Sequence, residues 1–212
     1  MSGIEWRKDL QKAQEEIRGG SRLLLLFFSG GVTDEGSKKL EEETLMDGQV
    51  QKLIERECLP MQFHVQKDQE ISNRFHVDWT PALIFADENG NEVERFVGYL
   101  PPKEFMAQII LSKGLSVFHL GRFAEAKALF EEIIEECPDS ELVPEAEYFL
   151  GAAKFKESGD TYALGEVCHT LMAKYPDSVW TKRCSVWSHV YTASRKPFEG
   201  YYASGSYGSG QY

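Results

Sequence analysis

An uninterrupted apolar run at residues 23–28 (LLLLFF) constrains the fold of this chain more than any other feature of its sequence. Successive side chains of a β-strand point to opposite faces, so a strand that is apolar at every position needs cover on both faces. The run is far shorter than the about 20 residues that span a bilayer, and mixed-charge residues precede it. We therefore expect a strand in the middle of a sheet, and neither a transmembrane helix nor a secretory signal.

Helical and strand-like patterns alternate around this run. Apolar residues recur at helical spacing from Ile4 to Ile17, and a glycine pair ends the pattern. Thr33 and Asp34 are good N-caps for the helix that follows the strand. Downstream, the patterns predict a helix at 49–58, a strand at 61–65, a short helix at 70–75, strands at 82–85 and 92–97 joined by a turn at 87–90, and a helix that begins at Pro101-Pro102. This order predicts an α/β sandwich with a mixed sheet.

The charge of the chain argues against two classes of partner. Lys and Arg number 23 against 34 Asp and Glu, a net charge of −11, and no segment concentrates the basic residues. Neither nucleic acid nor an anionic membrane surface is therefore expected to bind. An apolar fraction of 42% excludes a disordered chain. The acidic run at 41–43 lies one turn from Lys38 and Lys39, which is typical of a solvated helix face.

The cysteines and histidines form no recognisable metal or redox motif. The four cysteines are far apart, and no two are separated by two residues. We interpret them as buried thiols rather than disulfides, which suits a reducing cytoplasm. The histidines are isolated as well, so we expect no metal site and no cofactor.

Several local motifs together resemble one fold family. They are the strand at 24–28, the sequence Lys38-Lys39-Leu40-Glu41-Glu42-Glu43, Thr80-Pro81 before an apolar strand, and Gly98-Tyr99-Leu100-Pro101 before a helix. In this order and spacing they resemble the thioredoxin fold over about residues 1–110. The resemblance implies a thioredoxin-like domain at 1–105, in which Pro81 takes the place of a cis-proline that faces the redox motif.

The redox motif itself is replaced. In the family a CxxC sequence comes immediately before the Lys-Lys pair, and those positions are Asp34-Glu35-Gly36-Ser37 in this chain. Dithiol exchange needs a nucleophilic thiolate and a second thiol, and a carboxylate or hydroxyl replaces neither. We therefore expect no catalytic residues, with Asp34 and Ser37 at the lost redox positions. Asp34 is either a simple N-cap or a fixed negative charge with a chemical role.

From residue 107 to 191 the hydrophobic period is helical. Gly114, Phe123, Ala126, Phe130 and Pro138 resemble one tetratricopeptide repeat, and Pro138-Asp139-Ser140 recurs as Pro176-Asp177-Ser178, 38 residues later. We expect tetratricopeptide-like helical hairpins at 106–194. A helix at 102–119 would join them to the first domain, and a single helix at 179–191 would close them. Residues 195–212, rich in Gly, Ser and Tyr, are expected to be a flexible tail.

These features favour a redox-inactive adaptor or assembly factor that binds proteins or peptides. In the thioredoxin family a groove beside the cis-proline receives an extended peptide by backbone pairing. Its counterparts here are Gly30, Gly31, Val32, Trp79, Thr80 and Pro81. Trp79 could either anchor a peptide or plug the groove. Two alternatives stay open: a thiol-dependent oxidoreductase that uses the displaced Cys58, and a structural subunit that associates with itself.

Overall fold

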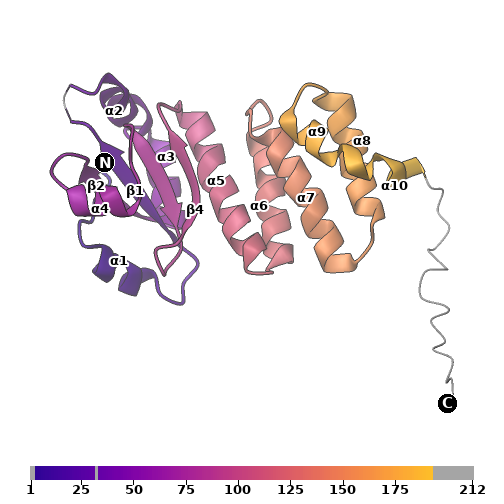
Figure 1. Ribbon diagram of the computed structural model, residues 1–212, viewed down its shortest axis with the longest axis horizontal. Helices are drawn as coiled ribbons and strands as arrows, with labels where there is room; N and C mark the ends of the chain where they lie inside the picture. The colour runs from indigo at the N-terminus through magenta and orange to yellow at the C-terminus, as the bar shows by residue number, and fades with distance from the viewer. Residues whose placement is uncertain (1–2, 32, 193–212) are drawn as a thin grey trace, which may run out of the picture.

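A four-stranded mixed sheet forms the core of the first part of the chain (Figure 1). The computed structural model describes residues 3–31 and 33–192. The strands, in the order β2-β1-β3-β4 across the sheet, are β2 (Cys58–His64), β1 (Leu23–Ser29), β3 (Ala82–Ala86) and β4 (Glu92–Val97). Strand β1 runs parallel to β2 and antiparallel to β3, which confirms the predicted mixed sheet. All residues of β1 are buried, as the apolar run predicts.

Two layers of helices cover the sheet. Leu24, Leu26 and Phe28 belong to one apolar cluster, together with side chains of α1 (Leu10–Ile17) and of the segment that contains α4 (Gln69–Arg74). The alternate residues of β1 belong to a second cluster. On that face of the sheet lie α2 (Glu35–Lys39) with its continuation as a π-turn η1 (Leu40–Thr44), α3 (Gly48–Glu57) and α5 (Pro102–His119), and the cluster continues beyond α5 into the helices that follow it. The fold is the α/β sandwich that the element order predicts.

Two boundaries differ from the prediction. Helix α1 begins only at Leu10, because Asp9 caps it, and the residues before it instead extend along β2 with a bridge from Arg7 to Met61. Strand β2 begins at Cys58 rather than at residue 61, although Pro60 interrupts its pattern. The Pro60 carbonyl accepts a bond from the Arg7 amide at 2.9 Å. The missing N–H of Pro60 therefore faces the outer edge, where a proline is tolerated.

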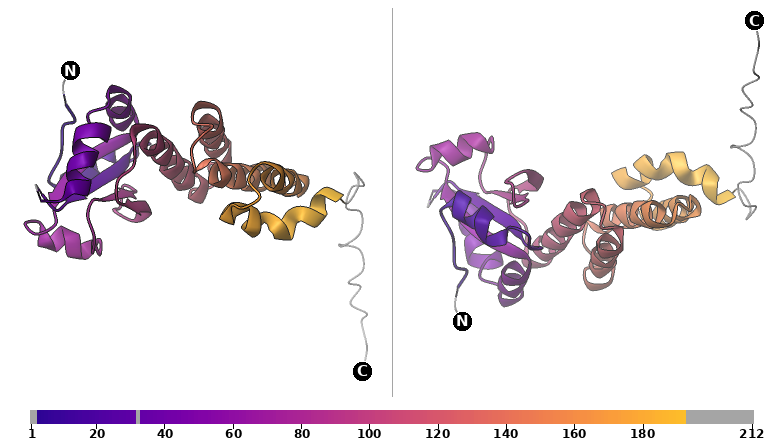
Figure 2. Two further views of the ribbon diagram at one scale, coloured as in Figure 1. Left: turned by 90° about the horizontal axis from the view of Figure 1, so that it is seen from above. Right: turned by 90° about the horizontal axis from the view of Figure 1, so that it is seen from below.

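The second part of the chain is a row of helices that extends from α5 (Figures 1 and 2). Its members are α6 (Phe123–Glu136), α7 (Val143–Ser158), α8 (Tyr162–Lys174), α9 (Val179–Cys184) and α10 (Ser188–Thr192). From α5 to α8, each helix packs against the next along the chain. The predicted helix at 102–119 is confirmed as α5, and it runs without a break across the predicted boundary at 105/106. The predicted single helix at 179–191 is wrong, because a 3₁₀ turn (Ser185–Trp187) divides it.

The α5–α6 and α7–α8 hairpins repeat the same local design. A Cβ atom at Gly114 would lie 2.6 Å from Cε1 of Phe130, and Gly151 is pressed against Val167 in the same way. Each glycine therefore allows two helices to approach closely. Gly121 and Gly159 follow the first helix of each pair with φ values of 76° and 73°, a conformation that favours glycine. The assignment of these hairpins to the tetratricopeptide type stays a prediction.

No helix of the described residues combines the length and apolar character that a membrane crossing needs. The predicted tail at 195–212 lies outside the described residues.

Candidate functional site

The Asp34 carboxylate organises the turn between β1 and α2. Its Oδ1 atom accepts a hydrogen bond from the Ser37 amide at 3.1 Å, so Asp34 is the N-cap of α2. Its Oδ2 atom accepts a bond from the Gly30 amide at 3.1 Å and one from the Ser37 hydroxyl at 2.5 Å. The structure therefore brings together the two residues that the sequence assigns to the lost redox positions, and it links them by a hydrogen bond. Thr33, the other predicted cap, does not take that role.

This network fixes the charge of Asp34. Partial burial acts to raise its pKa, but hydrogen bonds from Ser37, Thr80 and the Gly30 amide outweigh burial and lower the pKa to about 2. Asp34 is therefore ionised at neutral pH and is a poor proton donor or acceptor. Its geometry is that of a helix cap, one of the two interpretations that the sequence allows.

Pro81 lies directly against the first turn of α2. The Thr80-Pro81 peptide bond is cis, as the family resemblance implies. A Cβ atom at Gly36 would lie only 2.8 Å from Cδ of Pro81, so no larger residue fits there without movement. A Cβ atom at Gly30 would likewise lie 2.8 Å from Oγ1 of Thr80. The cis-proline loop and the Asp34–Ser37 turn therefore form one continuous surface.

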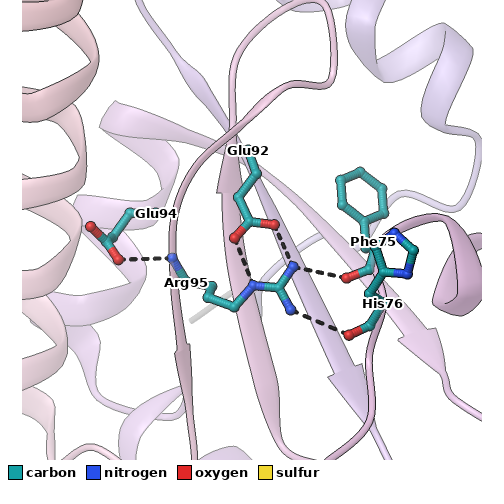
Figure 3. Close-up of polar contacts among 5 residues, drawn as sticks. All are labelled: Phe75, His76, Glu92, Glu94 and Arg95. Carbon is teal, nitrogen blue, oxygen red and sulfur yellow. Dashed lines mark hydrogen bonds and ion pairs between the residues drawn. The ribbon is translucent and has the colours of Figure 1, made fainter.

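Arg95 of β4 holds the segment that leads into the cis-proline loop (Figure 3). Its guanidinium donates to the Phe75 carbonyl at 2.8 Å and to the His76 carbonyl at 3.4 Å. Glu92, three residues earlier on the same strand, forms an ion pair with the guanidinium through both carboxylate oxygens. The Glu94 side chain instead accepts a bond from the Arg95 amide at 3.1 Å. The sequence does not single out Arg95, because a charged residue on a half-exposed strand gives no signal of its partners.

Trp79 does not plug the predicted groove. Its side chain, which immediately precedes Thr80 of the Thr80-Pro81 cis bond, is 73% exposed. Among the described residues, no hydrogen bond involves the backbone of Thr80. Gly31 adopts a φ of 84° and lies against the His64 ring at the end of β2. Val32, the remaining predicted groove residue, lies outside the described residues.

Cys58 lies at the opposite end of the sheet from Asp34. It pairs with Leu23 at the start of β1, whereas Asp34 follows the end of that strand. Its side chain is buried, and burial together with the neighbouring Glu57 raises the pKa of the thiol to about 12, against smaller opposing effects of Lys113 and Arg22. The structure therefore does not bring a reactive thiol to the predicted site.

Two further surface hollows lie away from the cis-proline loop. One lies between α1 and the α4 segment and includes Leu10 and Phe63; the other includes Ile4, Ile54 and Pro60. Across residues 3–31 and 33–192, no three His, Cys, Asp or Glu side chains are grouped so that they could hold a metal ion.

Part of this chain is similar to one known family and to several solved structures. Residues 10–111 match the sequence model of a family described as a thioredoxin-like domain. A thioredoxin from Thermus thermophilus is 22% identical over 51% of this chain and 85% of its own, with a TM-score of 0.45. The DsbH oxidoreductase is 19% identical over 46% of this chain and 78% of its own, with a TM-score of 0.40. The oxidised C-terminal domain of Neisseria meningitidis DsbD is 15% identical over 49% of this chain and 96% of its own, with a TM-score of 0.41.

No curated protein matches the sequence. The family match ends within α5, so it does not extend to the helices from α6 onward. The match and the mixed sheet with its flanking helices together show that residues 10–111 form a thioredoxin-like domain.

Proposed function

We propose that this protein is a redox-inactive adaptor or assembly factor of the cytoplasm, which binds protein or peptide partners. The cis-proline surface of the thioredoxin-like domain takes an extended peptide. The helical hairpins, which we interpret as tetratricopeptide-like, offer a second surface for a partner. The observation that carries the proposal is the exposed Trp79 side chain beside a cis-proline loop that has no thiol next to it.

The Asp34–Ser37 pair supports the absence of thiol chemistry. A carboxylate that accepts hydrogen bonds from the Gly30 amide and from the Ser37 amide and hydroxyl caps the helix, and it has no means of attacking a disulfide. The hydrogen bond between the two side chains spans the positions that a disulfide spans in the redox-active members of the family. The local fold of the turn is therefore kept without a redox function.

The backbone of Thr80 supports peptide binding. Strand β3 begins only at Ala82, and the backbone of Thr80 makes no hydrogen bond with the described residues. An extended segment could pair with the Thr80 backbone, as in β-strand addition. The neighbouring indole of Trp79 supplies a large apolar surface for one side chain of that segment, and aromatic residues are enriched among the residues that carry most binding energy.

The repeated hairpins support a second binding surface. Gly114–Phe130 and Gly151–Val167 make equivalent close contacts within the two pairs, and α6 of the first pair packs against α7 of the second. Such arrays present extended surfaces to partners. A partner that contacts both surfaces would gain affinity from the link between them.

A peptide selection tests the proposal. The full chain is exposed to a library of random peptides, and the Kd of a selected peptide is measured by fluorescence anisotropy. We expect Trp79→Ala to weaken binding about tenfold or more, the factor given by about 1.4 kcal/mol. Met46→Ala is the matched control, because Met46 is also exposed (69%) but lies between η1 and α3, outside both proposed surfaces.

A second arm tests the backbone pairing. N-methylation of single peptide amides removes one donor at a time, and we expect it to abolish binding at the position opposite Thr80. If no peptide is selected above background, or if both alanine variants weaken binding equally, the proposed surface is wrong. Sedimentation equilibrium then decides the structural-subunit alternative, which requires a stable self-association.

A further inference from the structure

Cys168 of α8 and Cys184, the last residue of α9, lie side by side in the structure. Their Sγ atoms are 2.7 Å apart. That separation is shorter than the about 3.5–4.0 Å at which two unbonded carbon atoms pack best, and sulfur is the larger atom. Both side chains are fully buried. The sequence, in which these cysteines are well separated, gave no reason to pair them.

The fold holds the two thiols together through specific contacts of α9. Ser178 caps this helix, with its Oγ atom accepting a bond from the Trp180 amide at 3.2 Å. The Thr181 hydroxyl lies 2.5 Å from the Tyr175 carbonyl, to which it donates. Cys184 lies three residues beyond Thr181, so it is on the same face of α9, and that face is packed against α8. The contact between the thiols therefore follows from how α9 is anchored.

The surroundings of the two thiols are largely apolar, although the Cys184 thiol also donates to the Thr181 carbonyl at 3.2 Å. Val167 and Leu171 share their cluster, and Tyr148, Tyr175 and Trp187 pack against it. Among the described residues no third His, Cys, Asp or Glu side chain joins the two thiols in a group that could hold a metal ion. Cys58 and Cys137 are also buried and free, but neither has a thiol contact among the described residues, and they serve as internal controls.

We propose that Cys168 and Cys184 are an oxidation site, where a small-molecule disulfide such as oxidised glutathione converts the two thiols into a disulfide bond that fastens α9 to α8. One cysteine loses its proton and its sulfur attacks the glutathione disulfide, which releases one glutathione and leaves a mixed disulfide. The second cysteine loses its proton and attacks the protein sulfur, which releases the second glutathione. Two protein thiols are thereby oxidised, one glutathione disulfide is reduced, and the two protons end on the released glutathione thiols.

The reaction requires α9 to open transiently. Burial, together with the neighbouring Cys168, raises the pKa of the Cys184 thiol to about 12, so the reactive thiolate is rare in the closed state. Helices α9 and α10 lie at the far end of the row, away from the sheet (Figure 2). Elements at such an end open more easily than a core. Once formed, the buried disulfide is shielded from reductants by the same packing.

Peptide mapping of the folded full chain tests the proposal. Protein is incubated with excess oxidised glutathione or with dithiothreitol, quenched in acid, alkylated and digested. We expect the oxidised sample to contain a peptide pair linked through Cys168 and Cys184, while Cys58 and Cys137 are recovered as alkylated thiols. Cys137→Ser should keep the link and Cys184→Ser should lose it. The proposal is wrong if a folded sample retains both thiols, stops at the mixed disulfide, or links other cysteines.

Amide hydrogen exchange tests the consequence for α9. We expect exchange at residues 179–184 to slow about tenfold or more on oxidation, a factor that corresponds to about 1.4 kcal/mol of local stabilisation. Exchange in α6, which is remote from the bond, should not change. Equal exchange of α9 in the oxidised and reduced protein would show that the bond does not fasten the helix. Neither measurement depends on the proposed peptide binding.

Discussion

Replacing Glu145 with glutamine should make the protein more stable at neutral and alkaline pH. Glu145 is partly buried in the first turn of α7. Burial, and then repulsion from Glu94 of β4, raises the pKa of its carboxyl from 4.5 to about 7, although Arg183 of α9 opposes the rise. The folded protein therefore favours the protonated carboxyl, which glutamine resembles in shape and in charge.

The sign of the effect follows from this raised pKa. A carboxyl whose pKa is higher in the folded state than in the unfolded state stabilises the fold fully below pH 4.5, and that contribution is lost as the pH rises through about 7. At about 1.36 kcal/mol per unit, the full shift corresponds to about 3 kcal/mol. Solvent screening of a partly exposed group reduces this to about 1–2 kcal/mol. Glutamine has no proton to lose, so the variant avoids the loss.

Thermal unfolding at several pH values measures the difference. For a chain of this length, about 1–2 kcal/mol raises the Tm by about 2–8 °C. We expect the Glu145→Gln variant to exceed the wild type by this amount at pH 8 and to match it at pH 4. Glu131→Gln, on an exposed position of α6, is the matched control. A Tm difference that is the same at both pH values would refute the reasoning, because it would come from packing rather than from ionisation.

Three further substitutions or measurements test the other sites. Asp34→Asn should lower the free energy of unfolding by about 1–2 kcal/mol at pH 6. The difference in stability between variant and wild type should vanish as the pH falls from 3.8 to about 2, because the wild-type carboxylate is then protonated and loses its charge. Gly114→Ala should lower the Tm and the free energy of unfolding, the latter by about 1–3 kcal/mol, because the added methyl group collides with Phe130. Gly48→Ala should leave the Tm unchanged, because no atom lies within 4 Å of its added methyl group. Cys58 should alkylate far more slowly in the folded than in the unfolded chain, and the protein should not accelerate the reduction of insulin by dithiothreitol above the rate in buffer. Turnover above that rate that depends on Cys58 would restore the oxidoreductase alternative.

The fold was predictable from local patterns, and most of the side-chain network was not. The apolar run of β1 and the helix cap at Asp34 are each determined by a few neighbouring residues, so the sequence reveals both. Arg95 meets carbonyl groups about 20 positions away along the chain, and Cys184 meets Cys168 across a turn. Contacts of this kind depend on how strands and helices pack, which no local pattern encodes.

The π-turn after α2 and the early start of β2 were missed for a related reason. Both are decided by burial against other elements, not by the propensity of the residues themselves. For Trp79 the sequence allows two roles, either to anchor a peptide or to fill the groove, and the exposure of its side chain excludes the second.

The unbroken helix α5 makes the two parts of this molecule mechanically one. Its first half closes the sheet through Phe105 and Ile109, and its second half receives Phe130 of α6 at Gly114. At about 1.5 Å per residue, such a helix is a stiff rod about 27 Å long. Truncation of the chain at residue 105 would remove the helix that covers one face of the sheet. Truncation after α5 would expose the apolar side of α5 that packs against α6. A ligand that tilted the rod at one end would therefore move the whole row of helices at the other.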